Sequence, residues 1–366
     1  MNIKLRLTVM NFLQFAVWGS YLTSMGTYLF NIGLAENIGI FYAMQGIVSL
    51  FMPALIGIVA DRWIQAQKLL GICHLLAATF MVATGYYALN AAEVEFSTLF
   101  SLYACSVAFY MPTLGLSNSV AYSSLTKAGL DTVKHFPPIR VWGTVGFICA
   151  MWCCDLAGFQ ASAWQFMQSA AIGVVLGLYA FTMPECPTNK GGEKKSLAEA
   201  LGLNAFALFK QKKMALFFIF SILLGVSLQI TNGFANPFIS DFGQVTQYAD
   251  TFGVQHANIL ISLSQISETL CILLIPFCLR RFGIKNVMLM AMGAWVLRFG
   301  LFGLGNPGGG VWMFLLSMIV YGVAFDFFNV SGSLFVDKET DDKIRSSAQG
   351  LFIMMTNGIG ATIGTL

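Results

Sequence analysis

Residues 311–335 read VWMFLLSMIVYGVAFDFFNVSGSLF. A helix needs roughly 20 apolar residues to cross a hydrocarbon core about 30 Å thick, and this stretch is longer than that. Its one charged residue is Asp326. An ionisable side chain at bilayer depth costs at least about 2.5–3.5 kcal/mol on insertion scales, so it needs a reason to be there. The stretch therefore predicts a membrane-spanning helix whose acid has a function.

Ten further apolar segments resemble this one in length and composition. They lie at 7–31, 39–60, 69–89, 96–122, 138–155, 163–183, 214–240, 256–279, 286–304 and 346–366. The chain has 366 residues, of which 57% are hydrophobic and 10% are charged, whereas a soluble domain is about 45–50% apolar and about 25% charged. This composition excludes a soluble enzyme or nucleic-acid binder and predicts an all-α polytopic membrane protein.

The basic residues predict the orientation of the chain in the membrane. Except for Arg140 and Arg298, every Lys and Arg lies at the N-terminus or in loops that the predicted spans place on the same side. Opposite loops, such as 31–37 and 305–310, contain none. Basic loops stay in the cytoplasm, so we expect a cytoplasmic N-terminus.

The longest polar stretch divides the chain into two parts. We predict a six-helix bundle over 1–184, a cytoplasmic linker over 185–213 and a second bundle over 214–366. Within the linker, Ser196 and Glu199 form a candidate capping box that would open an amphipathic helix. The second bundle contains only five predicted spans. We therefore expect the chain to be truncated before a twelfth.

Polar and aromatic side chains recur on single helix faces inside the predicted spans. These faces are formed by Arg140, Thr144 and Phe147; by Gln229 and Asn232; by Gln265 and Glu268; and by Tyr321, Phe325 and Asp326. Together they predict a water-accessible cavity suited to an uncharged polar solute with a flat ring. Carboxyls that face such a cavity can also bind and release a proton, and Glu268 and Asp326 are the candidates.

Several alternatives remain open at this point. Gln and Asn in membrane helices often only join neighbouring helices, at about 0.6 kcal/mol on average. Arg298 is interpreted as structural. The sequence has no P-loop motif, no metal-binding motif and no catalytic constellation, which excludes a nucleotide-driven pump and argues against an enzyme. A transporter, or a transporter-like sensor that binds its ligand without moving it, satisfies the pattern.

Seven stretches resemble one known family. They are FMPALIGIVADRW (51–63), YMPTLGL (110–116), FPPIRVWGTVGF (136–147), LQITN (228–232), SQISETL (264–270), YGVAFDFFN (321–329) and AQG (348–350). Over residues 1–366 the chain is similar to the nucleoside:proton symporter family of the major facilitator superfamily, which contains bacterial nucleoside and xanthosine permeases. The superfamily pattern of the loop after the second span departs here at WIQAQK (63–68).

The resemblance implies two six-helix bundles in the bacterial inner membrane, alternating access and proton-driven import of nucleosides. It implies no cofactor besides the coupling proton, no metal and a monomer whose partners are nucleosides, protons and lipids. Substrate-binding positions would be Arg140, Thr144, Phe147, Gln229, Asn232, Gln265, Glu268, Tyr321, Phe325 and Asp326. Glu268 and Asp326 would couple the proton, and Asp61 and Arg62 would act in gating. Residues 140–147 also resemble the fifth helix of sugar:proton symporters, so an oligosaccharide substrate stays open.

Overall fold

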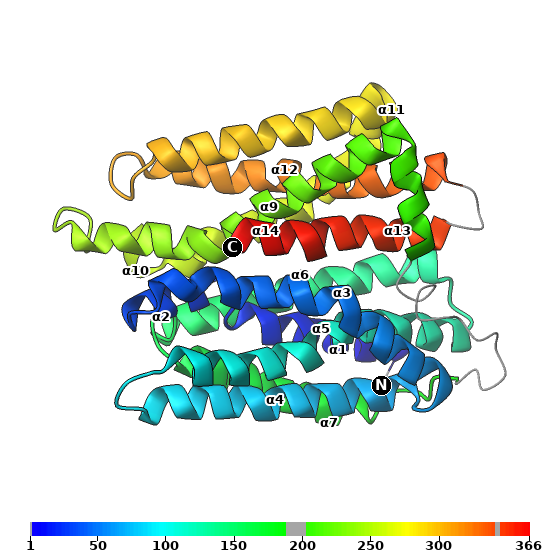
Figure 1. Cartoon of the computed structure of the whole chain (residues 1–366), viewed down its shortest axis with the longest axis horizontal. Helices are drawn as coiled ribbons and strands as arrows, with labels where there is room; N and C mark the ends of the chain where they lie inside the picture. Colours follow the sequence, from blue (N-terminus) through cyan, green and yellow to red (C-terminus); the bar gives the residue numbers. More distant parts are fainter. Residues whose placement is uncertain (1, 188–202, 341–344) are drawn as a thin grey trace. The chain divides into compact units, whose positions relative to one another are not determined.

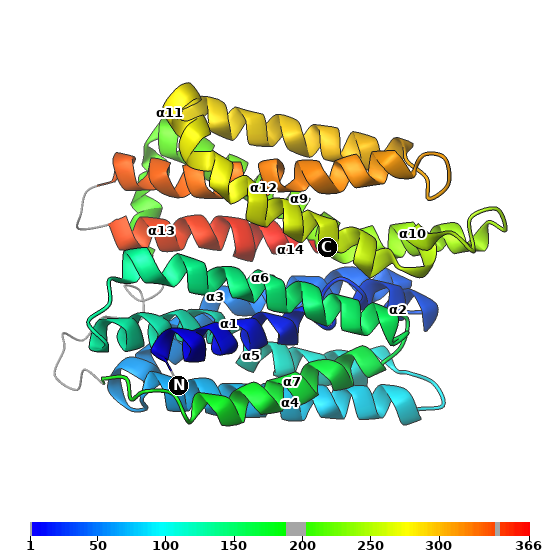
Figure 2. The same cartoon turned by 180° about the vertical axis from the view of Figure 1, so that it is seen from behind.

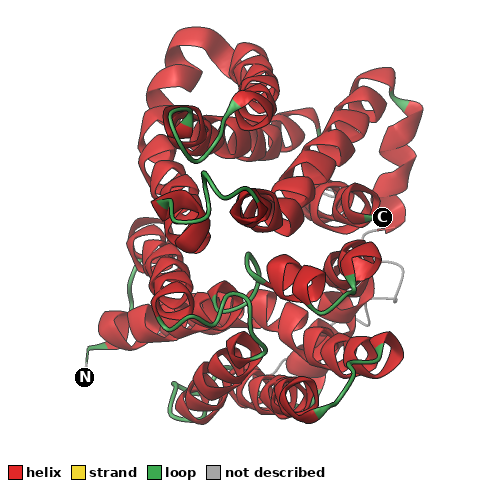
Figure 3. Cartoon of the chain, turned by 90° about the vertical axis from the view of Figure 1, so that its left-hand side faces the viewer, coloured by secondary structure: helices red, strands yellow, loops and turns green. Residues whose placement is uncertain are grey.

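The computed structural model describes residues 2–187, 203–340 and 345–366, without the side chains of 53–54, 58, 61–62, 133, 203–204, 337 and 345–347. Within these ranges the chain forms helices and connecting loops and no strand (Figure 3). It divides into two compact units, Met1–Ala200 and Leu201–Leu366. The predicted linker and its Ser196–Glu199 capping box fall mainly outside the described residues.

Unit 1 is an antiparallel helical bundle (Figure 1). Its helices are α1 (Ile3–Gly19), α2 (Met25–Asn31), η1 (Ala35–Asn37), α3 (Ile38–Arg62), α4 (Ala66–Asn90), α5 (Phe96–Lys127), α6 (Thr132–Leu156) and α7 (Trp164–Ala180). Helix α1 packs mainly on α6 and α7, while α4 packs on α5 and α7. Its buried apolar side chains include Leu7, Leu70 and Val120.

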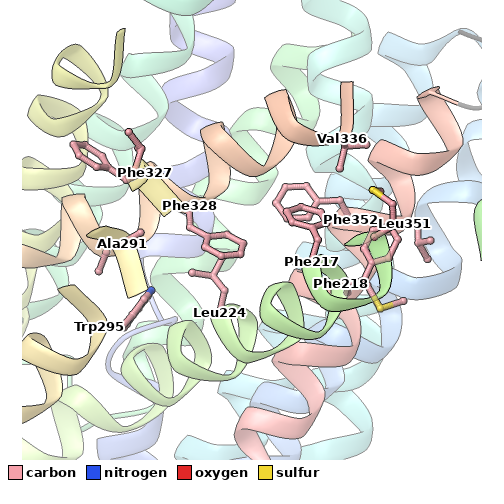
Figure 4. Packing of buried hydrophobic residues seen from close by; sticks show 14 of the residues in the cluster. Phe217, Phe218, Leu224, Ala291, Trp295, Phe327, Phe328, Val336, Leu351 and Phe352 are labelled. Carbon is pink, nitrogen blue, oxygen red and sulfur yellow. The ribbon is translucent and has the colours of Figure 1, made fainter. Parts of the chain in front are cut away.

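Unit 2 is a second helical bundle (Figure 2). Its elements are η2 (Leu203–Lys210), α9 (Lys212–Asp241), η3 (Phe242–Gln244), α10 (Phe252–Gln255), α11 (Ala257–Leu304), α12 (Val311–Glu339), α13 (Arg345–Ile353), the π-helix η4 (Met354–Gly360) and α14 (Ala361–Thr365). Figure 4 shows its apolar core, in which Phe217 and Phe352 lie near each other while Leu224 and Trp295 extend the cluster.

The predicted spans correspond closely to these helices. Among the described helices, six are long and apolar enough to cross a membrane, namely α4, α5, α6, α9, α11 and α12. Large apolar side chains such as Leu273 and Val296, each 75% exposed, cover their surfaces. A soluble protein avoids large exposed apolar surface, whereas lipid solvates it.

One predicted boundary differs from the structure and another is confirmed by it. The segment 7–31 is not one helix, because α1 ends at Gly19 and α2 begins at Met25. In the intervening turn the Ser20 hydroxyl donates to the Ala16 carbonyl oxygen at 2.8 Å, and such hydroxyls compete with helical hydrogen bonds. The segments 256–279 and 286–304 are two helices that share the label α11, and the backbone leaves the helical conformation between them at Gly283, where φ is 75°. Glycine adopts this left-handed conformation without steric penalty.

Glycines allow the helix backbones to approach closely. A Cβ on Gly146 of α6 would overlap the carbonyl oxygen of Phe12 on α1, and one on Gly19 would overlap that of Phe147. In unit 2 a Cβ on Gly225 of α9 would overlap the carbonyl oxygen of Thr356 in η4. Because lipid is as apolar as the side chains, membrane helices associate through close packing of this kind.

Candidate functional site

Helix α6 carries the candidate residues of unit 1. Phe147 is 8% exposed, whereas Arg140 and Thr144 are half-buried. The guanidinium carbon of Arg140 lies 3.9 Å from the centre of the Phe15 ring on α1, which is a cation–π arrangement. These three side chains follow one another at helical spacing along one face, as predicted.

Helix α9 contributes an amide pair to unit 2. The Asn232 side-chain amide donates to Oε1 of Gln229 at 3.0 Å. Gln229 is 8% exposed and Asn232 is half-buried. Each amide retains further donor or acceptor capacity after this bond, because an amide offers two donors and a carbonyl oxygen.

Helix α12 presents two aromatic rings beside an acid. The rings of Tyr321 and Phe325 stack with their centres 5.9 Å apart and their planes at 13°. Asp326 is only 3% exposed, and its Oδ2 has no hydrogen-bond partner among the described residues. Buried polar atoms are nearly always hydrogen-bonded, so an exception calls for an explanation.

Helix α11 brings a second acid to the same place. Glu268 is half-buried, and it interacts electrostatically with both Asp326 and Tyr321. One turn earlier, Oε1 of Gln265 is buried and has no hydrogen-bond partner in the described part of the chain. The structure therefore brings together the two acids that sequence spacing placed on different helices.

A buried arginine completes this charged cluster. Arg298 is fully buried, and its Nη1 donates to the Ser317 carbonyl oxygen at 2.8 Å. Its guanidinium carbon lies 4.6 Å from the centre of the Tyr321 ring and 5.5 Å from that of Phe302. Tyr321 thus interacts with Arg298 and with both acids.

The remaining predicted site residues are partly outside what the structure describes. Asp61 and Arg62, the predicted gating pair, end helix α3, and their side chains are not described. Among the described residues, no group of His, Cys, Asp and Glu is arranged to hold a metal ion. The candidate residues thus form two groups, one on α6 of unit 1 and one on α9, α11 and α12 of unit 2.

Known proteins identify the family to which these features belong. The model of the family described as Nucleoside H+ symporter matches residues 1–366. The chain belongs to the nucleoside H+ symporter family. Nucleoside permease NupG of Escherichia coli (strain K12) is 50% identical over 368 residues, which cover 100% of this chain and 86% of that protein. The xanthosine permease of the same organism is 48% identical over 369 residues, with 100% and 87% covered.

Solved structures agree with this family assignment. A crystal structure of the nucleoside transporter NupG matches with a TM-score of 0.90 at 50% identity, over 100% of this chain and 89% of that one. A crystal structure of a D-xylose-proton symporter matches with a TM-score of 0.71 at 14% identity, over 99% and 88%; this likeness concerns the fold alone. The protein is therefore a multi-pass, all-α transporter of the major facilitator type, as predicted.

Two residues beside the candidate face of α6, Trp18 and Gln45, were not predicted from the sequence. Trp18 of α1 packs against Phe147, and Gln45 of α3 accepts its indole N–H at 3.0 Å. A signal was present in the first span, where Asn11, Gln14 and Trp18 recur at helical spacing on one face. Inside an apolar segment, that pattern indicates a face turned toward other helices and not toward lipid.

Proposed function

We propose that the protein imports nucleosides by proton symport through alternating access. The observation that carries this proposal is the cluster of Glu268, Asp326 and Tyr321 in unit 2, in a chain of the nucleoside H+ symporter family. The names of its relatives, a nucleoside permease and a xanthosine permease, support nucleosides as the substrate class.

The chemistry of the candidate residues suits a nucleoside. Its base is flat and aromatic, and the Phe147 and Phe325 rings can pack against such a surface. Its ribose and base edges offer hydroxyl, amine and carbonyl groups, which Arg140, Thr144, Gln229, Asn232 and Gln265 can pair by hydrogen bonds. An uncharged polar solute of this kind needs many neutral partners and few charged ones.

The two acids, Glu268 and Asp326, form a binding site for the coupling proton. Two acids that lie close together gain from binding a proton, because two like charges would repel each other. Alternating exposure of Glu268 and Asp326 to the two sides would then move a proton together with the substrate. Asp61 and Arg62, the last two residues of α3, would act in gating.

The proposal includes a membrane topology. The basic residues favour a cytoplasmic N-terminus, and the Escherichia coli relatives support a location in a bacterial inner membrane. Residues 1–184 and 214–366 would form the two bundles of a monomer, joined by a cytoplasmic linker over 185–213.

Reconstituted vesicles provide the test. Purified protein is placed in liposomes, a pH gradient is imposed and uptake of labelled uridine is followed. We expect accumulation above the outside concentration, competition by other nucleosides and none by disaccharides, and loss of accumulation with a protonophore. Uptake that ignores the protonophore would contradict proton coupling. Competition by a disaccharide alone would contradict the substrate class, and binding without uptake would indicate a sensor.

A further inference from the structure

Helix α1 contacts the candidate face of α6 at both Arg140 and Phe147. The Phe15 ring lies under the Arg140 guanidinium at 3.9 Å. One turn further along α1, Gly19 leaves no room between the two backbones at Phe147. Because a Cβ on Gly19 would overlap the Phe147 backbone, this glycine allows α1 to contact α6 directly at Phe147.

Trp18 contacts the ring of Phe147 directly. The two ring centres are 6.4 Å apart and the planes meet at 88°, an edge-to-face pair. The indole also contacts the Tyr110 ring at 6.2 Å. Aromatic pairs in this geometry stabilise one relative orientation over others. Rotation of the indole would therefore change the surface on which the Phe147 ring rests.

A chain of hydrogen bonds fixes the indole. Its N–H donates to Oε1 of Gln45 on α3 at 3.0 Å, and the amide nitrogen of Gln45 donates to the Tyr103 hydroxyl on α5 at 2.9 Å. Gln45 is 2% exposed and Tyr103 is fully buried. The indole has a single N–H and the side chain of Gln45 has a single carbonyl oxygen. No other pair of atoms in these two side chains can therefore form the bond between Trp18 and Gln45.

We propose that Trp18 is a positioning residue for Phe147 and that Gln45 and Tyr103 hold it in place. Three helices, α1, α3 and α5, thereby set the angle at which Phe147 of α6 meets the flat base of a substrate. This inference rests on the proposed function, because it assigns a supporting residue to the same site. It predicts that nucleoside affinity depends on an indole N–H that does not itself touch the nucleoside.

The test is a double-mutant cycle on nucleoside binding. Trp18→Phe keeps an aromatic ring and removes the N–H, whereas Gln45→Leu removes its acceptor. Either change releases the indole from the position that orients Phe147, so each single variant should weaken nucleoside binding by about tenfold, seen in Kd and KM with little change in kcat. The double variant should bind nucleoside no more weakly than the weaker-binding single variant, because both substitutions remove the same hydrogen bond.

Three further variants complete the design. Trp142→Phe is the matched control, because Trp142 lies on α6 with 48% exposure, and its Kd should equal that of the wild type. Tyr103→Phe removes the hydroxyl that accepts from Gln45 and leaves the Trp18–Gln45 bond in place, so it should raise Kd by less than Gln45→Leu, and it serves if Gln45→Leu does not fold. Phe147→Leu should weaken binding at least as much as Trp18→Phe.

The outcomes separate this inference from the proposed function. Effects of Trp18→Phe and Gln45→Leu that multiply in the double variant, or an unchanged Kd in both, would overturn the positioning role. An unchanged Kd in Phe147→Leu would overturn it as well. A wild-type protein that binds no nucleoside would contradict the proposed function instead. In that case, melting temperatures without ligand still report whether Trp18 and Gln45 are coupled. They are measured for the wild type, the two single variants and the double variant.

Discussion

The two units support their candidate residues by different means. In unit 1 the candidate face contains one charge, Arg140, and it rests on the aromatic side chains of α1. In unit 2 the candidate residues include two acids, Glu268 and Asp326, beside the buried Arg298. Unit 1 is built to hold neutral groups at fixed angles, whereas unit 2 concentrates charge in a small volume.

Buried polar atoms without a partner differ in the same way. In the described part of unit 1 they belong to neutral side chains, such as Tyr21 and Tyr28. In the described part of unit 2 they include Oδ2 of Asp326 and two nitrogens of Arg298. An unpaired buried charge is much more costly than an unpaired hydroxyl. Charged groups are kept at such a cost where they have a function, so we propose that the proton chemistry lies in unit 2.

The largest expected effect comes from neutralising the acids of unit 2. We predict that Asp326→Asn and Glu268→Gln each abolish proton-driven accumulation of nucleoside, while one of them still allows exchange across the membrane. Amides retain the size of the acids but cannot exchange a proton. Uptake against a gradient, with and without a pH difference, measures this. Glu93→Gln, at an exposed loop position, should accumulate nucleoside as the wild type does, and full pH-dependent uptake by both acid variants would refute the assignment.

The next effect concerns packing, in which the two units should behave alike. Gly146→Ala and Gly225→Ala each place a methyl group against a carbonyl oxygen of a neighbouring helix. Overpacking of this kind costs about 1–3 kcal/mol, so both variants should unfold at lower temperature in detergent. Gly115→Ala is the control, because nothing lies within 4 Å of a Cβ built there. Equal melting temperatures for Gly146→Ala and Gly115→Ala would show that α1 and α6 are not in tight contact.

Replacing the one candidate charge of unit 1 should weaken binding without uncoupling transport. Arg140→Lys exchanges a planar guanidinium, stacked on Phe15 at 3.9 Å, for a compact ammonium that cannot stack or donate two parallel hydrogen bonds. We expect nucleoside binding about tenfold weaker, which corresponds to about 1.4 kcal/mol. Titration calorimetry measures this, with the exposed Arg281→Lys as control. Unchanged affinity would remove Arg140 from the site.

The smallest effect is expected from a charge pair at the surface of unit 2. Lys213 and Glu339 form a salt bridge at 2.5 Å with side chains 63% and 31% exposed. Pairs exposed to solvent contribute about 0–1 kcal/mol. Glu339→Gln should therefore leave both melting temperature and uptake close to those of the wild type. A loss comparable to that of Asp326→Asn would show that charge in unit 2 matters regardless of burial.

The sequence predicted the helices well and the contacts poorly, for identifiable reasons. Apolar length alone located the spans, and the basic turn at Arg280, Arg281 and Lys285 separated two of them where the backbone breaks at Gly283. The turn between α1 and α2 was missed because its residues are apolar enough to extend a span. The Ser20 hydroxyl donates to the Ala16 carbonyl oxygen there, a local hydrogen bond that can bend a helix.

Some residues of the candidate site were predictable from the sequence and others were not. The cost of burying an acid pointed to Glu268 and Asp326, and helical spacing grouped each with its neighbours. Spacing cannot show which helices face each other, so the position of Arg298 against Tyr321 and Phe302 was not predictable. Trp18 was also missed, because a tryptophan in an apolar segment is usually interpreted as packing or as an anchor at the membrane surface.

Proton movement caused by the substrate tests the central claim most directly. Liposomes containing the protein and a pH-sensitive dye are prepared without a pH gradient, and nucleoside is added outside. We predict that the interior acidifies with the wild type and with Glu93→Gln, and that the double variant Glu268→Gln/Asp326→Asn gives no signal. Acidification by the double variant at the rate of the wild type would contradict the account.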